Sequence, residues 1–281
     1  MDQQDQSSTP FHPQSSRDHP QQRLPFADRL NPTARNHFVA CCGEFIGTFF
    51  FLFFALSGTQ VANTTEDANE LMQLLYISLT FGFSLAVNAW VWFRVSGGLF
   101  NPAITLGMYL SGSVPLFRSL LVALSQLLGA VVASLVVHAI FPGPSAFTTA
   151  LSPPTTLLQG FLIETFLTFQ LLTTIQMLAA EKHSATFLSP IGIGLSLFIA
   201  ELSGVRFTGG SLNPARSFGP ALVLGEWPAE HWIYWAGPAA GSVAAAGLYK
   251  FLKVLDYERA NPGQDASGRG QGEEAGVRLL G

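Results

Sequence analysis

Charged side chains are scarce in this chain, because Asp, Glu, Lys and Arg together make up only 11% of its 281 residues. An average soluble domain carries roughly 25% charged residues. Apolar residues reach 48%, and phenylalanine alone occurs 24 times. This balance excludes an ordinary water-soluble domain and predicts that most of the chain lies in lipid.

Cysteine is also nearly absent, and the two that occur, Cys41 and Cys42, are adjacent within an apolar run. They cannot cross-link distant segments and lack the spacing of metal ligands, so we expect free thiols, with palmitoylation or redox chemistry as the alternative. The chain has no basic patch for nucleic acid, no nucleophile elbow and no phosphate loop. We therefore expect no enzyme, no cofactor, no metal site and no nucleic-acid partner.

Six stretches of mostly apolar residues have the length of about 20 that a membrane-spanning helix requires. They cover residues 37–57, 71–93, 116–141, 156–179, 187–205 and 231–252. Two further apolar stretches, residues 101–110 and 213–224, are about half that length, so we expect re-entrant or interfacial helices there. The predicted fold class is an all-α membrane protein with six transmembrane helices and two short half-helices.

The positions of Lys and Arg predict how these spans are oriented. Residues 58–70 and 142–155, which follow the first and third spans, hold no Lys or Arg, whereas the opposite side and both tails hold most of them. Both termini are thus expected in the cytoplasm. Residues 1–36 form a predicted disordered N-terminal tail, residues 37–252 the membrane domain and residues 253–281 a C-terminal tail.

Two arginines break this charge pattern, since Arg206 and Arg216 both fall in the outer segment between the fifth and sixth spans. Arg216 adjoins a short re-entrant stretch, which favours a functional role. The first outer segment carries Asn63-Thr64-Thr65, a triplet that permits N-glycosylation at Asn63. Such triplets also arise by chance, so the occupancy of Asn63 stays open.

An internal repeat organises the membrane domain. The segment Ser-Gly-Gly-Leu-Phe-Asn-Pro-Ala recurs later in the chain as Thr-Gly-Gly-Ser-Leu-Asn-Pro-Ala. Glu44, early in the first span, has a counterpart in Glu164, early in the fourth, and each is followed by the same Thr and Phe spacing. The repeats, about residues 37–141 and 156–252, each hold three spans, so the second is predicted to be inverted in the membrane.

The two motifs Asn101-Pro102-Ala103 and Asn213-Pro214-Ala215 suit the first turns of helices. Asn caps helix N-termini, and Pro is favoured at the first helical position. Two half-helices that enter from opposite faces would bring their positive dipole ends together near the midplane. That arrangement repels cations while the asparagine amides donate to a passing water, so we predict a water passage that excludes protons.

On these motifs, residues 38–252 resemble the aquaporin, or major intrinsic protein, family. The resemblance implies a right-handed bundle of six helices, and a homotetramer with one pore in each protomer. It also implies that Glu44 and Glu164 support the descending loops by accepting hydrogen bonds from backbone N–H groups. The residues that it implies for a narrow outer constriction are Phe81, Glu201, Gly210 and Arg216.

The chain resembles water-selective members of the family more than glycerol-conducting members. Ser217 and Ala221 follow the second motif, and Tyr234-Trp235 opens the last span. Glycerol-conducting members usually carry acidic and basic residues and Pro-Leu at these places. The predicted function is passive water transport. Hydrogen peroxide or another small neutral solute is the alternative permeant, and a coupled transporter or a non-conducting junctional protein is a further alternative.

Glu201 departs from the family pattern, because water-selective members typically have histidine at this position. An ionisable residue inside the membrane needs a partner, and Arg216 is the expected one, through a bidentate hydrogen bond. Two hypotheses follow. Glu201 either lines the pore as an acceptor, which favours permeants such as peroxide, or turns away and only braces Arg216.

The expected surroundings of the protein are a lipid bilayer and permeating water. A plasma membrane is favoured, with an internal membrane as the alternative. Two regulatory questions stay open from the sequence. One is whether the N-terminal tail, which contains Phe26, caps the cytoplasmic mouth, and the other is whether Ser184 is phosphorylated.

Overall fold

The computed structural model describes residues 31–67, 69–183 and 185–261. The chain divides into two compact units, Met1–Asn36 and His37–Gly281. In the first unit, the Asn31 side chain accepts a hydrogen bond from the backbone N–H of Thr33 at 2.9 Å, where α1 (Pro32–Thr64) begins. The hypotheses about a cap formed by the N-terminal tail, about Ser184 and about most of the C-terminal tail lie outside the described residues.

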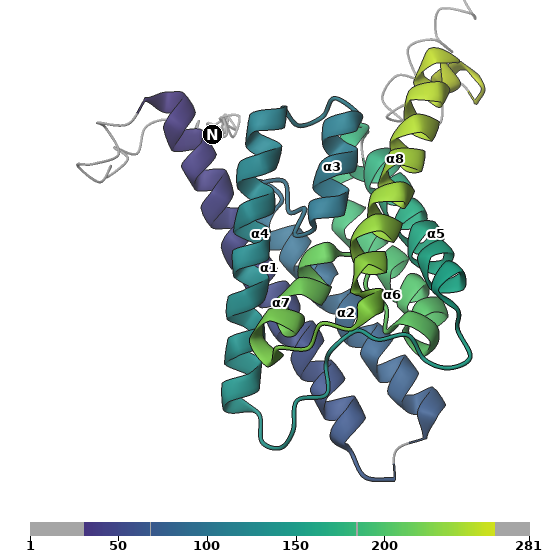
Figure 1. Cartoon of the computed structure of the whole chain (residues 1–281). Coiled ribbons are helices and arrows are strands. Elements are labelled where there is room, and N and C mark those ends of the chain that lie inside the picture. The colour runs from purple at the N-terminus through teal and green to yellow at the C-terminus, as the bar shows by residue number, and fades with distance from the viewer. Residues whose placement is uncertain (1–30, 68, 184, 262–281) are drawn as a thin grey trace, which may run out of the picture. The chain divides into compact units, whose positions relative to one another are not determined.

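The membrane domain contains two successive sets of helices, each with two long helices, one short helix and a further long helix (Figure 1). The first set comprises α1, α2 (Glu70–Trp92), α3 (Pro102–Leu110) and α4 (Leu116–Ile140). The second set comprises α5 (Leu157–Ile175), α6 (Ser189–Thr208), α7 (Pro214–Leu224) and α8 (Ile233–Val254). A π-helical turn, Gln176–Ala180, continues α5, and short 3₁₀ turns precede α6 and α8.

The predicted fold class is confirmed, because the described residues form six long helices and two short ones, joined by loops. The long helix α1, with 33 residues, extends beyond the predicted span at both ends. Within the described ranges, five helices are long and apolar enough to cross a membrane. The sixth long helix, α8, has the length but not the hydropathy, because Gly, Ala, Tyr and Lys replace larger apolar residues in it.

Paired glycines let the two sets of helices cross closely. Gly82 of α2 and Gly194 of α6 face each other, so that a Cβ atom on Gly82 would lie 2.8 Å from the carbonyl oxygen of Gly194. A Cβ atom on Gly194 would lie 2.5 Å from the carbonyl oxygen of Gly82. In a bilayer, where helices gain little from the hydrophobic effect, small residues of this kind allow the close backbone packing that drives association.

Single glycines also lie close to backbone carbonyls within each repeat. A Cβ atom on Gly129 of α4 would lie 2.6 Å from the carbonyl oxygen of Phe45 in α1. A Cβ atom on Gly241 of α8 would lie 2.3 Å from the carbonyl oxygen of Thr165 in α5. Phe45 and Thr165 each follow the repeated glutamate directly, so the two crossings lie at equivalent positions of the repeats.

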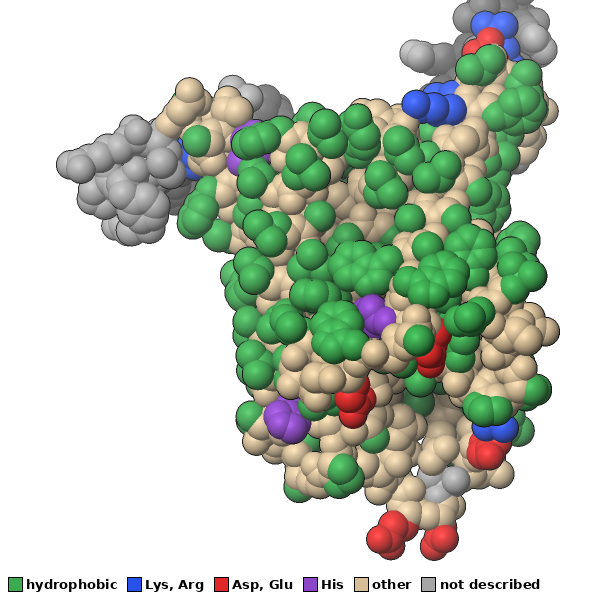
Figure 2. All heavy atoms as spheres, viewed as in Figure 1, with side chains coloured by type: hydrophobic (Ala, Val, Ile, Leu, Met, Phe, Trp, Pro, Cys, Tyr) green, Lys and Arg blue, Asp and Glu red, His purple; other side chains and the backbone are tan. Residues whose placement is uncertain are grey.

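Side chains that point outward from the helices are mostly large and apolar. Phe83 and Phe166, for example, expose 62% and 68% of their surface. Figure 2 shows apolar side chains spread over the helices on one face, with most of the acidic side chains in view in the half that carries the α1–α2 loop. An apolar exterior around an interior that contains buried Glu, Asn and Gln side chains is the arrangement that a bilayer requires.

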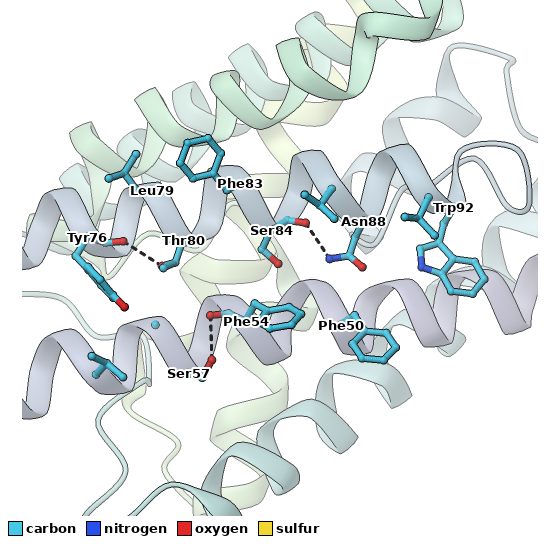
Figure 3. A pocket seen from close by; sticks show the side chains of 14 residues that line it. Phe50, Phe54, Ser57, Tyr76, Leu79, Thr80, Phe83, Ser84, Asn88 and Trp92 are labelled. Atoms are coloured by element: carbon cyan, nitrogen blue, oxygen red, sulfur yellow. Dashed lines mark hydrogen bonds between the residues drawn. The ribbon is translucent and has the colours of Figure 1, made fainter.

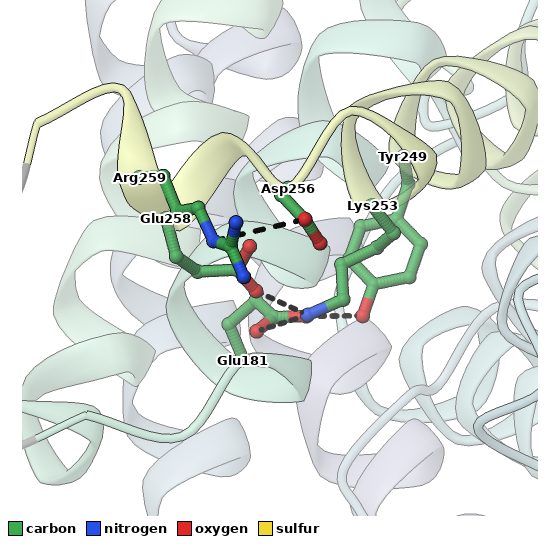
Figure 4. A network of polar contacts seen from close by, with 6 residues as sticks. All are labelled: Glu181, Tyr249, Lys253, Asp256, Glu258 and Arg259. Atoms are coloured by element: carbon green, nitrogen blue, oxygen red, sulfur yellow. Dashed lines mark hydrogen bonds and ion pairs between the residues drawn. The ribbon is translucent and has the colours of Figure 1, made fainter.

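A network of polar contacts ties the segment after α5 to the end of α8 (Figure 4). The Tyr249 hydroxyl donates to one oxygen of Glu181, and Lys253 Nζ lies 3.3 Å from the other. Lys253 also pairs with Glu258 at 2.6 Å. Partial burial alone would raise the pKa of Glu181, but the hydrogen bonds from Tyr249 and Lys253 outweigh it, so the pKa of this carboxyl is lowered.

We expect Gly194→Ala to destabilise the protein, because the added carbon would lie 2.5 Å from both the Gly82 carbonyl oxygen and the Ala86 side chain. Overpacking of this kind costs about 1–3 kcal/mol. Gly247→Ala is the matched control, since a Cβ atom there meets nothing within 4 Å. Thermal unfolding of the purified protein in detergent tests this prediction. Equal melting temperatures for the two variants would contradict the close α2–α6 crossing.

The stability contributed by the Glu181 network should depend on pH. The folded-state pKa of Glu181 lies below its ordinary value of 4.5, so its contribution is present above that value and is lost as the pH falls through the folded-state pKa. Tyr249→Phe removes the hydroxyl donor and keeps the ring. The melting temperature of this variant should therefore fall less than that of the unmodified protein between pH 7 and about pH 3.5.

Tyr76→Phe is the control for this measurement, because Tyr76 lies half-exposed on α2, away from the network. An identical pH dependence in Tyr249→Phe, Tyr76→Phe and the unmodified protein would rule out a contribution of the Glu181 network.

Candidate functional site

Each half-helix begins at the asparagine of its motif, as the sequence predicts. Asn101 precedes α3 in an extended conformation, and its side-chain oxygen accepts hydrogen bonds from the backbone N–H groups of Ala103 at 2.9 Å and Ile104 at 3.3 Å. Asn213 caps α7 in the same way through the N–H of Ala215 at 2.9 Å. The prolines occupy the first helical positions, where an N–H group would have had no partner.

The two asparagines also bind across the repeat boundary. Asn101 Nδ2 donates to the carbonyl oxygen of Leu212 at 2.8 Å, and Asn213 Nδ2 donates to that of Phe100 at 2.9 Å. Phe100 and Leu212 both have positive φ values, 52° and 50°, which turn each carbonyl toward the opposite half-helix. The two positive helix ends therefore abut inside the protein. Each amide has two protons, so one proton of each asparagine remains for a permeant.

Glu44 holds the first descending loop by its backbone. Its two carboxylate oxygens accept hydrogen bonds from the N–H groups of Leu99 at 3.0 Å and Phe100 at 2.8 Å. Gln126 of α4 donates a third hydrogen bond to Glu44 at 2.7 Å and also contacts Thr105 of α3. Since Glu44 is fully buried, these donors are its only available partners in the described structure.

Glu164 holds the second loop in the equivalent way. It accepts hydrogen bonds from the N–H groups of Ser211 at 3.0 Å and Leu212 at 2.7 Å, and from the Thr208 hydroxyl at 2.7 Å. Tyr234 of α8 supports the start of the same loop by donating to the Thr208 carbonyl at 2.9 Å. Both glutamates thus have the contacts that a loop-supporting role requires.

A narrow passage runs past the asparagines. A cavity of about 20 Å³ is lined by Phe81, Leu85, Asn101, Ser211 and Asn213, among others. A single water molecule needs roughly 10–15 Å³ of such volume. The cavity adjoins a vestibule of about 450 Å³, because both are lined by Gly98 and Leu99.

The vestibule is also lined by basic residues of the predicted cytoplasmic side, Arg118 and Lys182. The ammonium group of Lys182 lies 5.3 Å from the centre of the Phe93 ring, which lines the same space. A wide, basic vestibule thus leads into a narrow cavity beside the two asparagines.

A larger groove, of about 850 Å³, lies between α1 and α2 and is not part of this passage (Figure 3). Half-exposed rings such as Phe54 and Phe83 line it. Its polar side chains bind the helices themselves. Thr80 donates to the Tyr76 carbonyl and Asn88 to the Ser84 carbonyl, as the dashed lines in Figure 3 mark. The groove therefore belongs to the outward, apolar surface of the bundle.

The four residues that the family resemblance implies for the constriction come together on the other side of the asparagines. Arg216 is buried, with 1% of its surface exposed, and donates to the carbonyl oxygens of Gly210 at 3.1 Å and Phe147 at 2.8 Å. A longer contact of 3.4 Å reaches the carbonyl oxygen of Gly209. The guanidinium carbon lies 5.2 Å from the centre of the Phe81 ring. Backbone oxygens and an aromatic face therefore hold the guanidinium in place.

The prediction of a bidentate hydrogen bond between Glu201 and Arg216 is wrong. Glu201 is fully buried, and neither of its carboxyl oxygens has a hydrogen-bond partner in the part of the chain that the structure describes. Its Oε2 atom instead lies against Gly210, where a Cβ atom would be only 1.8 Å away. Loop carbonyls, including that of Phe147 between α4 and α5, bind one donor on each nitrogen of Arg216 and fix the guanidinium, so Glu201 does not form the bidentate pair in this structure. Glu201 thus has no hydrogen bond through which it could brace Arg216, as the second hypothesis required.

Sequence reasoning did not identify several residues that build this site. Phe147 supplies a carbonyl group, and Thr149 donates to the Ser217 hydroxyl at 2.8 Å, which in turn lies 2.7 Å from the Ser211 hydroxyl. Gln126 appeared in the sequence only as a polar residue inside a span. Glu44 lies 82 residues earlier, so nothing local in the sequence indicated that Gln126 binds it.

Two other predicted sites lie away from the passage. Asn63 is near the end of α1, and its side-chain nitrogen, which would carry a glycan, donates to the Ala146 carbonyl at 2.7 Å. Cys41 and Cys42 are both free thiols and half-buried. Neither site contributes to the constriction.

A membrane-embedded helix bundle in which two half-helices meet end to end along a narrow passage is a channel. A family profile described as Major intrinsic protein matches residues 33–249. The chain belongs to this family, and the family consists of channels and not of enzymes. The resemblance stated from the motifs alone is thereby confirmed.

Fungal aquaporins are among the relatives. Aquaporin-7 of Botryotinia fuckeliana is 58% identical over 251 residues, which cover 86% of this chain and 55% of that protein. Probable aquaporin-3 of Gibberella zeae is 48% identical over 239 residues, which cover 82% of this chain and 83% of that protein. The chain thus spans about half the length of the first relative and most of the second.

A solved structure shares the fold. The X-ray structure of the aquaglyceroporin from Plasmodium falciparum has a TM-score of 0.68 and 21% sequence identity. The match covers 77% of this chain and 95% of that chain. At this level of identity the likeness supports the fold and carries no information about the permeant.

We expect Glu164→Gln to destabilise the second loop. Glutamine has one acceptor oxygen, so its NH₂ group would face an N–H or hydroxyl donor now bound by the carboxylate. A buried polar group left without a partner costs about 1–3 kcal/mol. Glu70→Gln is the control, because Glu70 pairs with Arg206 on the exposed surface and such pairs contribute little. A lower melting temperature for Glu164→Gln only would support the anchoring role, and equal values would refute it.

Proposed function

We propose that this protein is a passive water channel that excludes protons and passes little glycerol. The observation that carries the proposal is the reciprocal pair of hydrogen bonds from Asn101 and Asn213, which places both helix N-termini at one point beside a cavity of about 20 Å³. A cavity of that size suits one water molecule at a time.

Proton exclusion follows from the charges around this point. The N-termini of α3 and α7 each carry a partial positive charge, and the guanidinium of Arg216 adds a full one nearby. A water oxygen that accepts the free protons of both asparagine amides has its own protons turned away from them. It then cannot accept a further proton from its neighbour in the file, and cations are repelled.

Selection against glycerol follows from the narrowness of the constriction. The Phe81 ring lies 5.2 Å from the guanidinium carbon of Arg216, so these two large side chains narrow the constriction and oppose the entry of a three-carbon polyol. The small Ser217 and Ala221 and the Tyr234-Trp235 pair also support water, by resemblance to water-selective members.

Hydrogen peroxide is the second candidate permeant. The observation that favours it is the Glu201 carboxyl, whose two oxygens bind no other described residue, so that its ionised form could accept both hydroxyl protons of a peroxide molecule. Histidine, which water-selective relatives typically have there, offers one acceptor at most when neutral.

The proposal includes the assembly and its place in the cell. We propose a homotetramer in the plasma membrane, with both termini in the cytoplasm. Support for this orientation comes from Arg118 and Lys182, which line the wide vestibule at one end, whereas the α1–α2 loop at the other end is acidic. Glycosylation at Asn63 would require the Ala146 contact to open.

The direct test is stopped-flow light scattering on proteoliposomes that contain the full chain. Water permeability should clearly exceed that of empty vesicles, whereas glycerol permeability should stay near the background. A peroxide-sensitive dye inside the vesicles measures the second candidate in parallel. Shrinkage no faster than in empty vesicles at any pH would refute the water channel, and rapid glycerol entry would refute the selectivity.

Asn213→Asp should lower the water permeability strongly while leaving the side-chain size unchanged. The carboxylate has no proton to donate to the Phe100 carbonyl, so two acceptors would face each other inside the protein, at a cost of about 1–3 kcal/mol. Asn63→Asp is the matched control, because Asn63 lies exposed at the end of α1. Flux that falls equally in both variants would contradict the central role of Asn213.

A further inference from the structure

The carboxyl group of Glu201 lies in the constriction in a way that a charged group does not tolerate. Both oxygens are buried beyond the reach of water and have no hydrogen-bond partner among the described residues. An ionised carboxylate without any partner is far more costly to bury than a neutral acid. The conformation therefore belongs to the protonated side chain.

In this conformation the side chain also fills the aperture. The Oε2 atom lies where the Cβ atom of a larger residue at position 210 would be, so Gly210 leaves the room that Glu201 occupies. Phe81 and Arg216 close the other sides and are each 1% exposed. A water-sized sphere therefore touches almost none of the surface of Phe81, Glu201 or Arg216. We infer that the neutral carboxyl group closes the passage here.

Arg216 retains hydrogen-bonding capacity that Glu201 does not use. A guanidinium group has five N–H donors. The backbone oxygens of Gly210, Phe147 and Gly209 occupy one proton each on three different nitrogens, so two donors are left. These two donors are the available partners for a carboxylate that leaves its place against Gly210.

The two charged groups that act on Glu201 favour movement in that direction. Arg216 from α7 attracts a negative charge at this position, and Glu164 from α5 repels it. From α8, Tyr234 directs its hydroxyl to the Thr208 carbonyl, and α2 contributes the uncharged Phe81. His231 lies one step farther out, with its ring centre 5.9 Å from that of Tyr234.

We propose that Glu201 is a proton-controlled plug that determines whether the constriction conducts. The neutral carboxyl group rests against Gly210 and blocks the passage. Loss of its proton makes burial at this position too costly, so the carboxylate rotates toward the free donors of Arg216. Water then enters the vacated space and the passage conducts. The inference rests on the proposed water channel and adds its regulation, with the open form favoured as the pH rises.

The test is water permeability of proteoliposomes as a function of pH, with the same pH on both sides. Buried carboxyl groups titrate up to about pH 8–9, so the range from about pH 4.5 to 9 covers the transition. The unmodified protein should conduct poorly at low pH and well at high pH, with the change spread over about two pH units as for one titrating group.

Two substitutions of Glu201 should act in opposite directions. Glu201→Gln keeps the shape of the neutral acid and cannot ionise, so its permeability should stay low at every pH. Glu201→Ala removes the plug, so its permeability should stay high at every pH. Size-exclusion chromatography and thermal unfolding establish that each variant is folded before its flux is compared.

Two further variants separate Glu201 from other titrating groups. Glu70→Gln changes an exposed carboxylate and should keep the pH profile of the unmodified protein. His231→Gln should keep it as well, if Glu201 and not the outer histidine is responsible. A profile that disappears in His231→Gln and survives in Glu201→Gln would overturn the proposal.

The remaining outcomes are equally decisive. Rapid flux through Glu201→Gln, or flux through the unmodified protein that does not change with pH, would refute the plug and leave the water channel intact. Absence of flux from the unmodified protein and from Glu201→Ala at every pH would instead refute the water channel itself.

Discussion

Two buried carboxylates carry the architecture of this channel, because they bind backbone that has no other partner. The loops that descend to the half-helices are irregular, and their N–H groups lie at a depth where lipid offers no acceptor. Glu44 and Glu164 each take two consecutive N–H groups and one side-chain donor. Without those acceptors the loops could not descend, and Asn101 and Asn213 could not meet.

Most of the fold was predictable from the sequence, because a bilayer restricts the possible structures so strongly. Length and hydropathy gave the long helices, and the odd number of spans in each repeat gave the inversion. The positions of Asn101 and Asn213 as caps followed from local chemistry alone. The hydropathy of α8 was the weakest signal, since small residues needed for close packing against α5 lower its apolar content.

The residues that form the constriction were predictable from the sequence, but the contacts between them were not. Nothing local in the sequence indicates that the carbonyl of Phe147, in the connection between α4 and α5, reaches Arg216. The expectation of a Glu201–Arg216 pair used only charge, and charge was outweighed by backbone geometry. Hydrogen bonds to carbonyl groups depend on the course of a loop, and side-chain identity does not encode that course. Gln126 illustrates the same limit, because its partner Glu44 is distant in sequence.

The reciprocal bonds between the motifs make the centre of the channel a joint product of both halves of the polypeptide. When the ribosome has inserted only α1 to α4, the amide of Asn101 faces the place of Leu212, which has not yet been made. The first half-helix therefore completes its hydrogen bonds only after the seventh helical segment has entered the membrane. Assembly of the conducting path is thus a late event of biogenesis, and a chain that ends after α4 leaves the Asn101 amide without this partner.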